Sequence, residues 1–213
     1  TATVLVLLRT MLVALLSVLQ MRKKGCGAAA AAAGREPVSV LLAAYNEARV
    51  LRSTLAALLN STYSGELEII VVDDGSLDET ADIAESFAGR DRRITLIRQE
   101  NLGKAAALRR ALAASRHEFI VMLDADTQFE PGTIDELTCH LRSPEVGAVS
   151  GHARVGNIQK LLGRFQSLEY TCSFNLDRRA YDLWNCITVA PGCVSAYRRS
   201  AILAAGGISS DTL

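Results

Sequence analysis

Apolar runs alternate with amphipathic stretches along the chain from Pro37 onward. The apolar runs predict strands at residues 38–43, 67–72, 94–97, 119–123 and 146–150. The stretches between them predict helices near residues 48–59, 78–88, 104–115 and 131–141. Residues 76–79 fit the capping box that opens a helix. Such alternation is typical of an α/β domain with a mostly parallel sheet and helices on both faces.

The N-terminus carries a longer apolar run. Residues 1–21 approach the roughly 20 apolar residues that span a bilayer core, and Arg9 is the one charged residue among them. Arg22-Lys23-Lys24 follow this run, whereas the positive residues of a cleaved signal peptide precede its apolar core. We therefore expect a transmembrane helix with a basic flank at 1–24, against the alternative of a buried or signal segment. The positive-inside rule then predicts a cell (inner) membrane protein whose catalytic domain is cytoplasmic.

Residues 25–36 include six consecutive alanines and are predicted to be an Ala/Gly-rich linker. Beyond Gly156, apolar residues recur at helical spacing, which favours core packing over a ligand surface; they are Ile158, Leu161, Leu162, Phe165 and Leu168. The formal net charge is zero, so no nucleic acid partner is expected. The five cysteines lack Cys-x-x-Cys spacing, which argues against a zinc site or a disulfide framework and agrees with reduced thiols in the cytoplasm.

Two of the predicted strands end in acidic residues. Asp73-Asp74 follows the strand at 67–72, and Asp124-Ala125-Asp126 follows the strand at 119–123. Parallel strands expose their carboxyl ends at one edge of the sheet, so these acids are expected to form one site. Mg²⁺ and Mn²⁺ prefer carboxylate oxygens and leave room for substrate phosphates. The alternative is ordinary turn and helix-capping chemistry.

Four motifs follow one another along the chain, at residues 39–47 (SVLLAAYNE), 71–80 (VVDDGSLDET), 101–108 (NLGKAAAL) and 123–127 (LDADT). In sequence and spacing they resemble family 2 glycosyltransferases of the GT-A fold. Residues 175–180 and 185–192 look like the membrane synthases of poly-β-1,6-N-acetylglucosamine, with chitin-oligosaccharide and hyaluronan synthases as wider relatives. Ala44, where the family usually has proline, and Arg109, where it often has asparagine, depart from the pattern.

The resemblance implies a role for each matched residue. Tyr45 and Glu47 would border the uridine of a UDP-sugar, Asp74 or its neighbour Asp73 would hold uracil and ribose, and Lys104 would contact the diphosphate. Asp124 and Asp126 would engage ribose and a Mg²⁺ or Mn²⁺ ion, with Asp126 the more direct ligand. The residues expected near the acceptor are Pro191, Gly192, Cys193 and Arg198. Taken one at a time, each keeps a plain structural alternative, such as a half-buried sheet residue, a helix-start acid or a surface arginine.

By the same resemblance, the protein is an inverting, metal-dependent transferase that moves N-acetylglucosamine from its UDP donor onto a growing β-linked polysaccharide at the lipid bilayer. The Thr-Glu-Asp motif that supplies the catalytic base is expected beyond Leu213, so the GT-A domain at 37–213 is expected to be incomplete at its C-terminus and inactive alone.

Two other classes of protein are disfavoured because this sequence lacks residues that they require. No lysine follows Lys160 to serve a phosphoreceiver module, and no Gly-x-Gly-x-x-Gly supports a dehydrogenase. A non-catalytic nucleotide-sugar-binding or interaction module remains the alternative.

Overall fold

The computed structural model of the chain describes residues 2–21, 36–152, 161–170, 172, 176–184, 186 and 194–209. The chain divides into two compact units, which are treated separately below. One unit contains residues 1–27 and 152–190, and the other contains residues 28–151 and 191–213.

The second unit is built on a six-stranded sheet of order β3-β2-β1-β4-β6-β5. Its strands are β1 (Val38–Ala44), β2 (Leu67–Asp73), β3 (Ile94–Arg98), β4 (Phe119–Asp124), β5 (Ala148–Ser150) and β6 (Val194–Arg198). β1, β2, β3 and β4 run parallel to one another, whereas β6 runs antiparallel to both β4 and β5. The prediction of a mostly parallel sheet is therefore confirmed, and β6 is the strand that it did not include.

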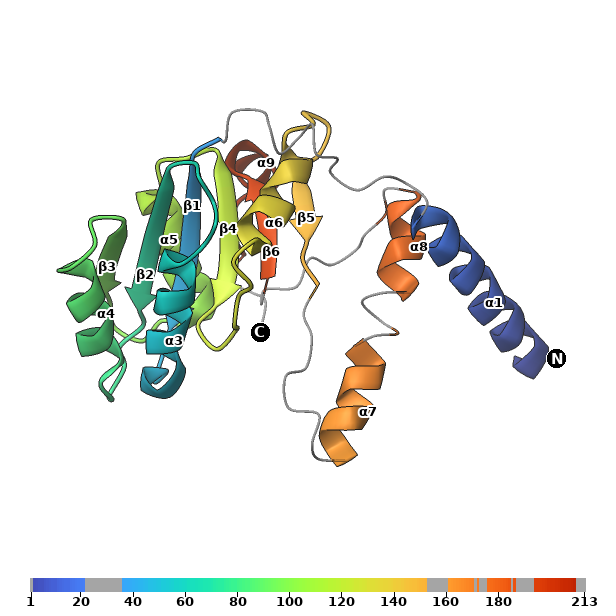
Figure 1. Ribbon diagram of the computed structural model, residues 1–213, viewed down its shortest axis with the longest axis horizontal. Coiled ribbons are helices and arrows are strands. Elements are labelled where there is room, and N and C mark those ends of the chain that lie inside the picture. Colours follow the sequence, from blue (N-terminus) through green and yellow to red (C-terminus); the bar gives the residue numbers. More distant parts are fainter. Residues whose placement is uncertain are drawn as a thin grey trace. The chain divides into compact units, whose positions relative to one another are not determined.

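Helices cover both faces of this sheet (Figure 1). They are α3 (Ala48–Leu59), α4 (Thr80–Ala88), α5 (Lys104–Ala114), α6 (Thr133–Leu141) and α9 (Arg199–Ala204). The core on the α5 face joins alternate residues of the central strands, such as Leu41, Ile70 and Ile120, to Leu112 of α5 and Ile202 of α9. Successive strand residues point to opposite faces, so burial of whole runs such as β2 requires cover on both sides.

The start of α4 differs from the prediction. The helix begins at Thr80, and its N-cap residue Glu79 makes no capping hydrogen bond through its side chain. Ser76 Oγ instead accepts a hydrogen bond from Asn46 N, and Asp78 accepts one from Thr80 N. The predicted capping box is therefore wrong, because these side chains join the turn after β2 to the turn after β1 and shape the first residues before α4.

The other unit contains three described helices: α1 (Ala2–Met21), α7 (Leu161–Tyr170) and α8 (Arg178–Asp182). α1 packs against α8. Ser17 Oγ donates to Leu176 O at 2.6 Å, and Gln20 Nε2 donates to Asp182 Oδ2 at 3.0 Å. Residues 3–20 of α1 are long and apolar enough to cross a membrane.

Two expectations fail in detail. The side chains of Phe165 and Leu168 on α7 are 62% and 61% exposed, so the predicted core packing of this stripe is wrong for both residues. Cys139 on α6 is disulfide-bonded, which corrects the expectation of reduced thiols for this residue. Cys172 and Cys186 are free and exposed.

Candidate active site

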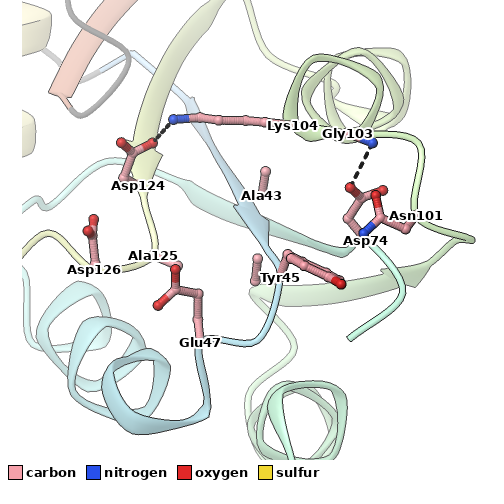
Figure 2. Close-up of a pocket in the computed structure, with 11 residues that line it drawn as sticks. Ala43, Tyr45, Glu47, Asp74, Asn101, Gly103, Lys104, Asp124, Ala125 and Asp126 are labelled. Atoms are coloured by element: carbon pink, nitrogen blue, oxygen red, sulfur yellow. Dashed lines mark hydrogen bonds and ion pairs between the residues drawn. The ribbon is translucent and has the colours of Figure 1, made fainter. Parts of the chain in front are cut away.

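A cleft of about 440 Å³ opens at the carboxyl ends of β1, β2 and β4 (Figure 2). It is lined by Ala43, Ala44, Tyr45, Glu47, Asp74, Asn101, Gly103, Lys104, Asp124, Ala125 and Asp126. The structure thus brings together the predicted donor and metal residues, with the exception of Asp73. Asn101 and Gly103 also line the cleft without having been predicted, although both lie within the matched motif at 101–108.

The register of the sheet explains why these residues meet. Ala43 pairs with Asp124 of β4, and Ala44 pairs with Asp73 of β2, so the three parallel strands end at the same level. The residues that follow each strand end therefore leave the sheet beside one another. This is the edge where open α/β sheets bind their ligands.

Asp74 is buried and holds the connection between β3 and α5. Its Oδ1 accepts hydrogen bonds from Gln99 Nε2 at 2.7 Å and Leu102 N at 3.0 Å, and its Oδ2 accepts one from Gly103 N at 2.9 Å. Asp73 is also buried, does not line the cleft, and has an Oδ1 without a hydrogen-bond partner. Of the two adjacent acids, Asp74 is the one positioned to act in the cleft.

Lys104 and Asp124 face each other across the cleft. Lys104 is the first residue of α5, and its Nζ lies 2.5 Å from Asp124 Oδ1. The lysine side chain is 53% exposed. An ion pair this exposed contributes at most about 1 kcal/mol to stability. The ammonium group can therefore leave Asp124 and bind an anionic ligand at little cost in free energy.

Hydrogen bonds to its backbone carbonyl groups hold the Asp124-Ala125-Asp126 turn in place. Thr54 Oγ1 of α3 donates a buried hydrogen bond of 2.6 Å to Ala125 O, and Thr127 N donates to Asp124 O at 3.1 Å. Asp126 is exposed at the cleft. The turn therefore presents one carboxylate that is paired with lysine and one that is open to solvent.

Glu47 is the fourth residue with a carboxyl group that lines the cleft. Its backbone N–H donates to Thr80 Oγ1 at 2.8 Å, which fixes the start of α3. Burial raises the pKa of Glu47, and the negative charges of Asp126, Asp78 and Asp124 raise it further. These acids are thus close enough to repel one another, and a cation among them would relieve that repulsion.

The donor chemistry of the cleft fits a hard divalent cation. Carboxylate oxygens are the ligands that Mg²⁺ and Mn²⁺ prefer. Among the described residues, no group of three His, Cys, Asp or Glu side chains could hold a metal ion by itself. A cation held by Asp126 and Asp124 would therefore complete its shell with water and with oxygen atoms of a bound ligand, as Mg²⁺ commonly does.

The residues that were predicted to lie near the acceptor are not found in the cleft of the described structure. Pro191, Gly192 and Cys193 lie outside the described residues. Arg198 pairs with Phe119, at the opposite end of β4 from Asp124. Its guanidinium donates to Leu141 O and to Ser143 O, and lies over the Phe119 ring at 5.4 Å. The structure therefore does not bring Arg198 to the cleft. Its contacts give the side chain a structural role at the other end of β4.

Comparison with known proteins identifies the chain. Residues 39–204 match the family model described as glycosyl transferase family 2. Similar curated proteins include the poly-beta-1,6-N-acetyl-D-glucosamine synthases of Staphylococcus epidermidis, at 31% identity over 183 residues, and of Staphylococcus aureus, at 32% over 181 residues. Each match covers 84% of this chain but 43% of the relative, so the chain spans less than half the length of these relatives.

Solved structures agree with the fold. The mannosyltransferase PcManGT from Pyrobaculum calidifontis is 24% identical, with a TM-score of 0.67 over 92% of this chain and 54% of that chain. TarS residues 1–349 from S. aureus are 21% identical, with a TM-score of 0.52 over 59% of this chain and 38% of that chain. Because the family model covers most of the sequence, from the first strand of the sheet through α9, the chain belongs to glycosyltransferase family 2.

Proposed function

We propose that this chain carries the donor site of an inverting transferase that moves N-acetylglucosamine from UDP-N-acetylglucosamine onto a growing β-linked polysaccharide. The observation that carries the proposal is the convergence of Tyr45, Glu47, Asp74, Lys104, Asp124 and Asp126 on one cleft. The poly-β-1,6-N-acetylglucosamine synthases support the choice of sugar and polymer. A TarS structure solved with UDP-GlcNAc and a glucosyl-3-phosphoglycerate synthase structure solved with UDP support the choice of nucleotide.

The nucleoside and diphosphate would occupy different parts of the cleft. Tyr45 is 44% exposed at the rim and offers an aromatic face on which uracil can stack. Asp74 fixes the backbone that leads into Lys104, so the ammonium group is held where the diphosphate would lie. Lys104 would then leave Asp124 and stabilise the negative charge that develops on the departing UDP.

A divalent cation at Asp126 and Asp124 would neutralise the diphosphate and polarise its bond to the sugar. The solved PcManGT complex, which contains GDP-mannose and Mn²⁺, supports this assignment. Inversion also requires a base that takes the proton of the acceptor hydroxyl as it attacks the anomeric carbon. We further propose that α1 holds the enzyme at the cytoplasmic side of the cell membrane, where the acceptor polymer grows.

The test is isothermal titration calorimetry of UDP against the 213-residue chain in detergent micelles. We expect measurable affinity with Mg²⁺ or Mn²⁺ and a loss of roughly tenfold or more when a chelator is present, because unscreened carboxylates repel the diphosphate. Asp126→Asn should remove most of the dependence on metal.

Asp82→Asn is the matched control, because Asp82 is an exposed acid on α4 outside the cleft. This variant should bind UDP as the unmodified chain does. Equal UDP affinity of the unmodified chain with and without the chelator would refute the metal-bridged diphosphate.

A further inference from the structure

In the part of the chain that the structure describes, the polar contacts between α1 and the α8 segment lie in the C-terminal half of α1. Ser17 and Gln20 each donate a hydrogen bond to the α8 segment, and Ser17 is buried. Ala180 of α8 is completely buried as well. Residues 3–12 of α1 are exposed on every side. Small buried residues allow two helices to approach closely, so α8 is fixed to one end of the apolar helix.

That end of α1 is the one next to the basic cluster Arg22-Lys23-Lys24. A helix rises about 1.5 Å per residue, so Ser17 and Gln20 lie only about 6 Å and 2 Å along the axis from Met21. A 20-residue helix is about 30 Å long, which equals the thickness of the hydrocarbon core. If α1 spans the bilayer, α8 therefore lies at the level of the lipid head groups.

The surface of the α8 segment suits that level. Arg178, Arg179 and Asp182 carry charges that are costly in the hydrocarbon core. Trp184, the single tryptophan of the chain, follows α8 with its backbone N–H bonded to Tyr181 O at 3.1 Å, and it is 60% exposed. Leu176, just before α8, is 38% exposed. Tryptophan next to charged residues is the composition found where a protein meets the membrane–water interface.

We propose that α8 and Trp184 form an interfacial anchor, which lies among the phospholipid head groups of the leaflet next to residues 22–24. This proposal rests on the proposed membrane location of α1 and adds a second, sequence-distant contact with the lipid. The bilayer is preferred to a protein partner because α8 is attached to α1 at the depth where head groups begin, and because its exposed residues combine charge with an aromatic ring.

The single tryptophan allows a direct test by fluorescence. The 213-residue chain is reconstituted into phosphatidylcholine–phosphatidylglycerol vesicles that contain lipids spin-labelled either near the head group or near the end of the acyl chain. We expect the shallow label to quench Trp184 more strongly than the deep label. Quenching by aqueous iodide without quenching by either lipid label would place Trp184 in water and overturn the proposal, as would stronger quenching by the deep label.

A matched variant tests the membrane insertion of α1 separately from the interfacial position of Trp184. In the double variant Trp184→Phe, Leu12→Trp, the only tryptophan lies near the middle of α1, and the deep label should quench it more strongly. If this probe is deep while Trp184 is quenched by neither lipid label, α1 spans the bilayer and the anchor is refuted. If neither probe is quenched by lipid labels, both membrane contacts are refuted. UDP titration of the same samples tests the donor site independently of either result.

A second variant tests the attachment to α1. Ser17→Leu places a larger side chain where Ser17 is buried against the α8 segment. We expect shallow quenching of Trp184 to decrease in this variant, while a tryptophan at position 12 in the Trp184→Phe background stays deep. Unchanged shallow quenching in Ser17→Leu would show that α8 does not owe its depth to α1, and it would overturn that part of the proposal.

Discussion

At the scale of single residues, Gly75 lies where the connection after β2 approaches the connection between β3 and α5 closely. Its φ is +74°, and a Cβ atom at this position would lie 2.8 Å from Asn101 N. Other residues rarely adopt such a φ, and the backbone of Asn101 cannot move aside without disturbing the hydrogen bonds that Asp74 makes to Leu102 and Gly103. Gly75 therefore permits the close packing that positions Lys104.

We expect Gly75→Ala to lower the free energy of unfolding by about 1–3 kcal/mol, since it combines an unfavourable φ with a backbone clash. Urea unfolding followed by circular dichroism measures this change, and UDP affinity should fall with it. Gly132→Ala is the control, because Gly132 has a φ of −87° and a Cβ atom added there would meet no non-neighbouring atom within 4 Å. Equal stability of the two variants would contradict the argument.

The sequence predicted most of the residues that line the cleft but did not decide between two adjacent aspartates. The carboxyl ends of buried strands identified Asp124 and Asp126, and motif matches identified Tyr45, Glu47 and Lys104. Asp73 and Asp74 could not be separated, because adjacent residues at a strand end point in different directions and the choice depends on the register with β1. Asn101 was missed because its place in the cleft depends on a loop whose shape is set by hydrogen bonds to Asp74.

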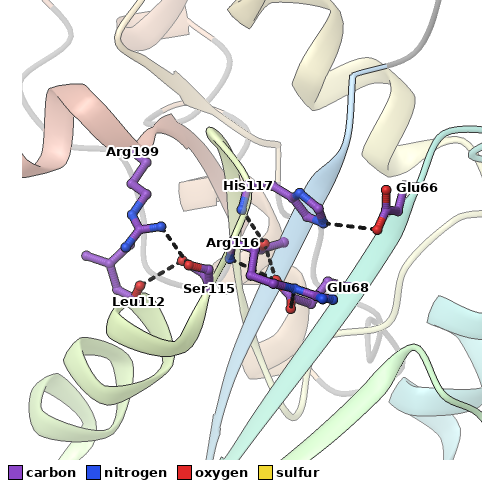
Figure 3. Close-up of polar contacts among 8 residues, drawn as sticks. Glu66, Glu68, Leu112, Ser115, Arg116, His117 and Arg199 are labelled. Carbon is purple, nitrogen blue, oxygen red and sulfur yellow. Dashed lines mark hydrogen bonds and ion pairs between the residues drawn. The ribbon is translucent and has the colours of Figure 1, made fainter.

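At the scale of secondary-structure elements, Glu68 connects three segments at the amino-terminal side of the sheet (Figure 3). Glu68 lies on β2 and accepts a hydrogen bond of 2.6 Å from Ser39 Oγ on β1. It also accepts bonds from the backbone N and the Nε of Arg116, in the connection from α5 to β4. Burial alone would raise the pKa of Glu68, but these hydrogen bonds together hold it below its ordinary value of 4.5.

We expect Glu68→Gln to lower stability at pH 7 by about 1–3 kcal/mol, because the buried hydroxyl of Ser39 and the backbone N–H and exposed guanidinium of Arg116 lose a charged acceptor. The pKa of Glu68 is lowered in the folded protein, so its contribution is present above pH 4.5 and is lost as the pH falls through the lowered folded value. Urea unfolding at pH 7 and pH 3 should therefore show a smaller difference from the unmodified chain at pH 3.

Glu66→Gln provides the control for this prediction. The Glu66 side chain is 64% exposed and lies 3.8 Å from His117 Nε2, so its loss should change stability by less than about 1 kcal/mol. A Glu68→Gln variant no less stable than this control at pH 7 would contradict the proposed role of the network.

Most elements of the sheet could be predicted because each is signalled locally by an apolar run or an amphipathic stretch. β6 could not, since Val194–Arg198 is only five residues long and mixes small, polar and charged residues instead of forming an apolar run. Its three buried residues lie in a strand that is placed between β4 and β5 and packs against α6 and α9. That placement depends on pairing between distant parts of the chain, which a local pattern does not contain.

At the scale of the whole molecule, the proposal that the chain after α1 lies on the cytoplasmic side of the membrane can be tested through Cys26, which follows the basic cluster. In a variant that keeps Cys26 as its only cysteine, an impermeant maleimide should label this residue only after the cells are permeabilised, because positive flanks remain in the cytoplasm. Anti-tag blotting for a mass-shifted maleimide measures the labelling. Labelling in sealed cells would contradict the proposed orientation.

The placement of β6 between β4 and β5 also has a consequence for synthesis of the protein. A ribosome adds about 5–20 residues per second, so roughly 4 to 14 s separate the appearance of Asp124, which completes β4, from that of Val194, which begins β6. All the residues that line the cleft have been made once the ribosome has added Asp126. The cleft can therefore form on the nascent chain while one side of β4 still lacks its neighbour. During those seconds the open edge of β4 is exposed to mispairing with strands of other nascent chains.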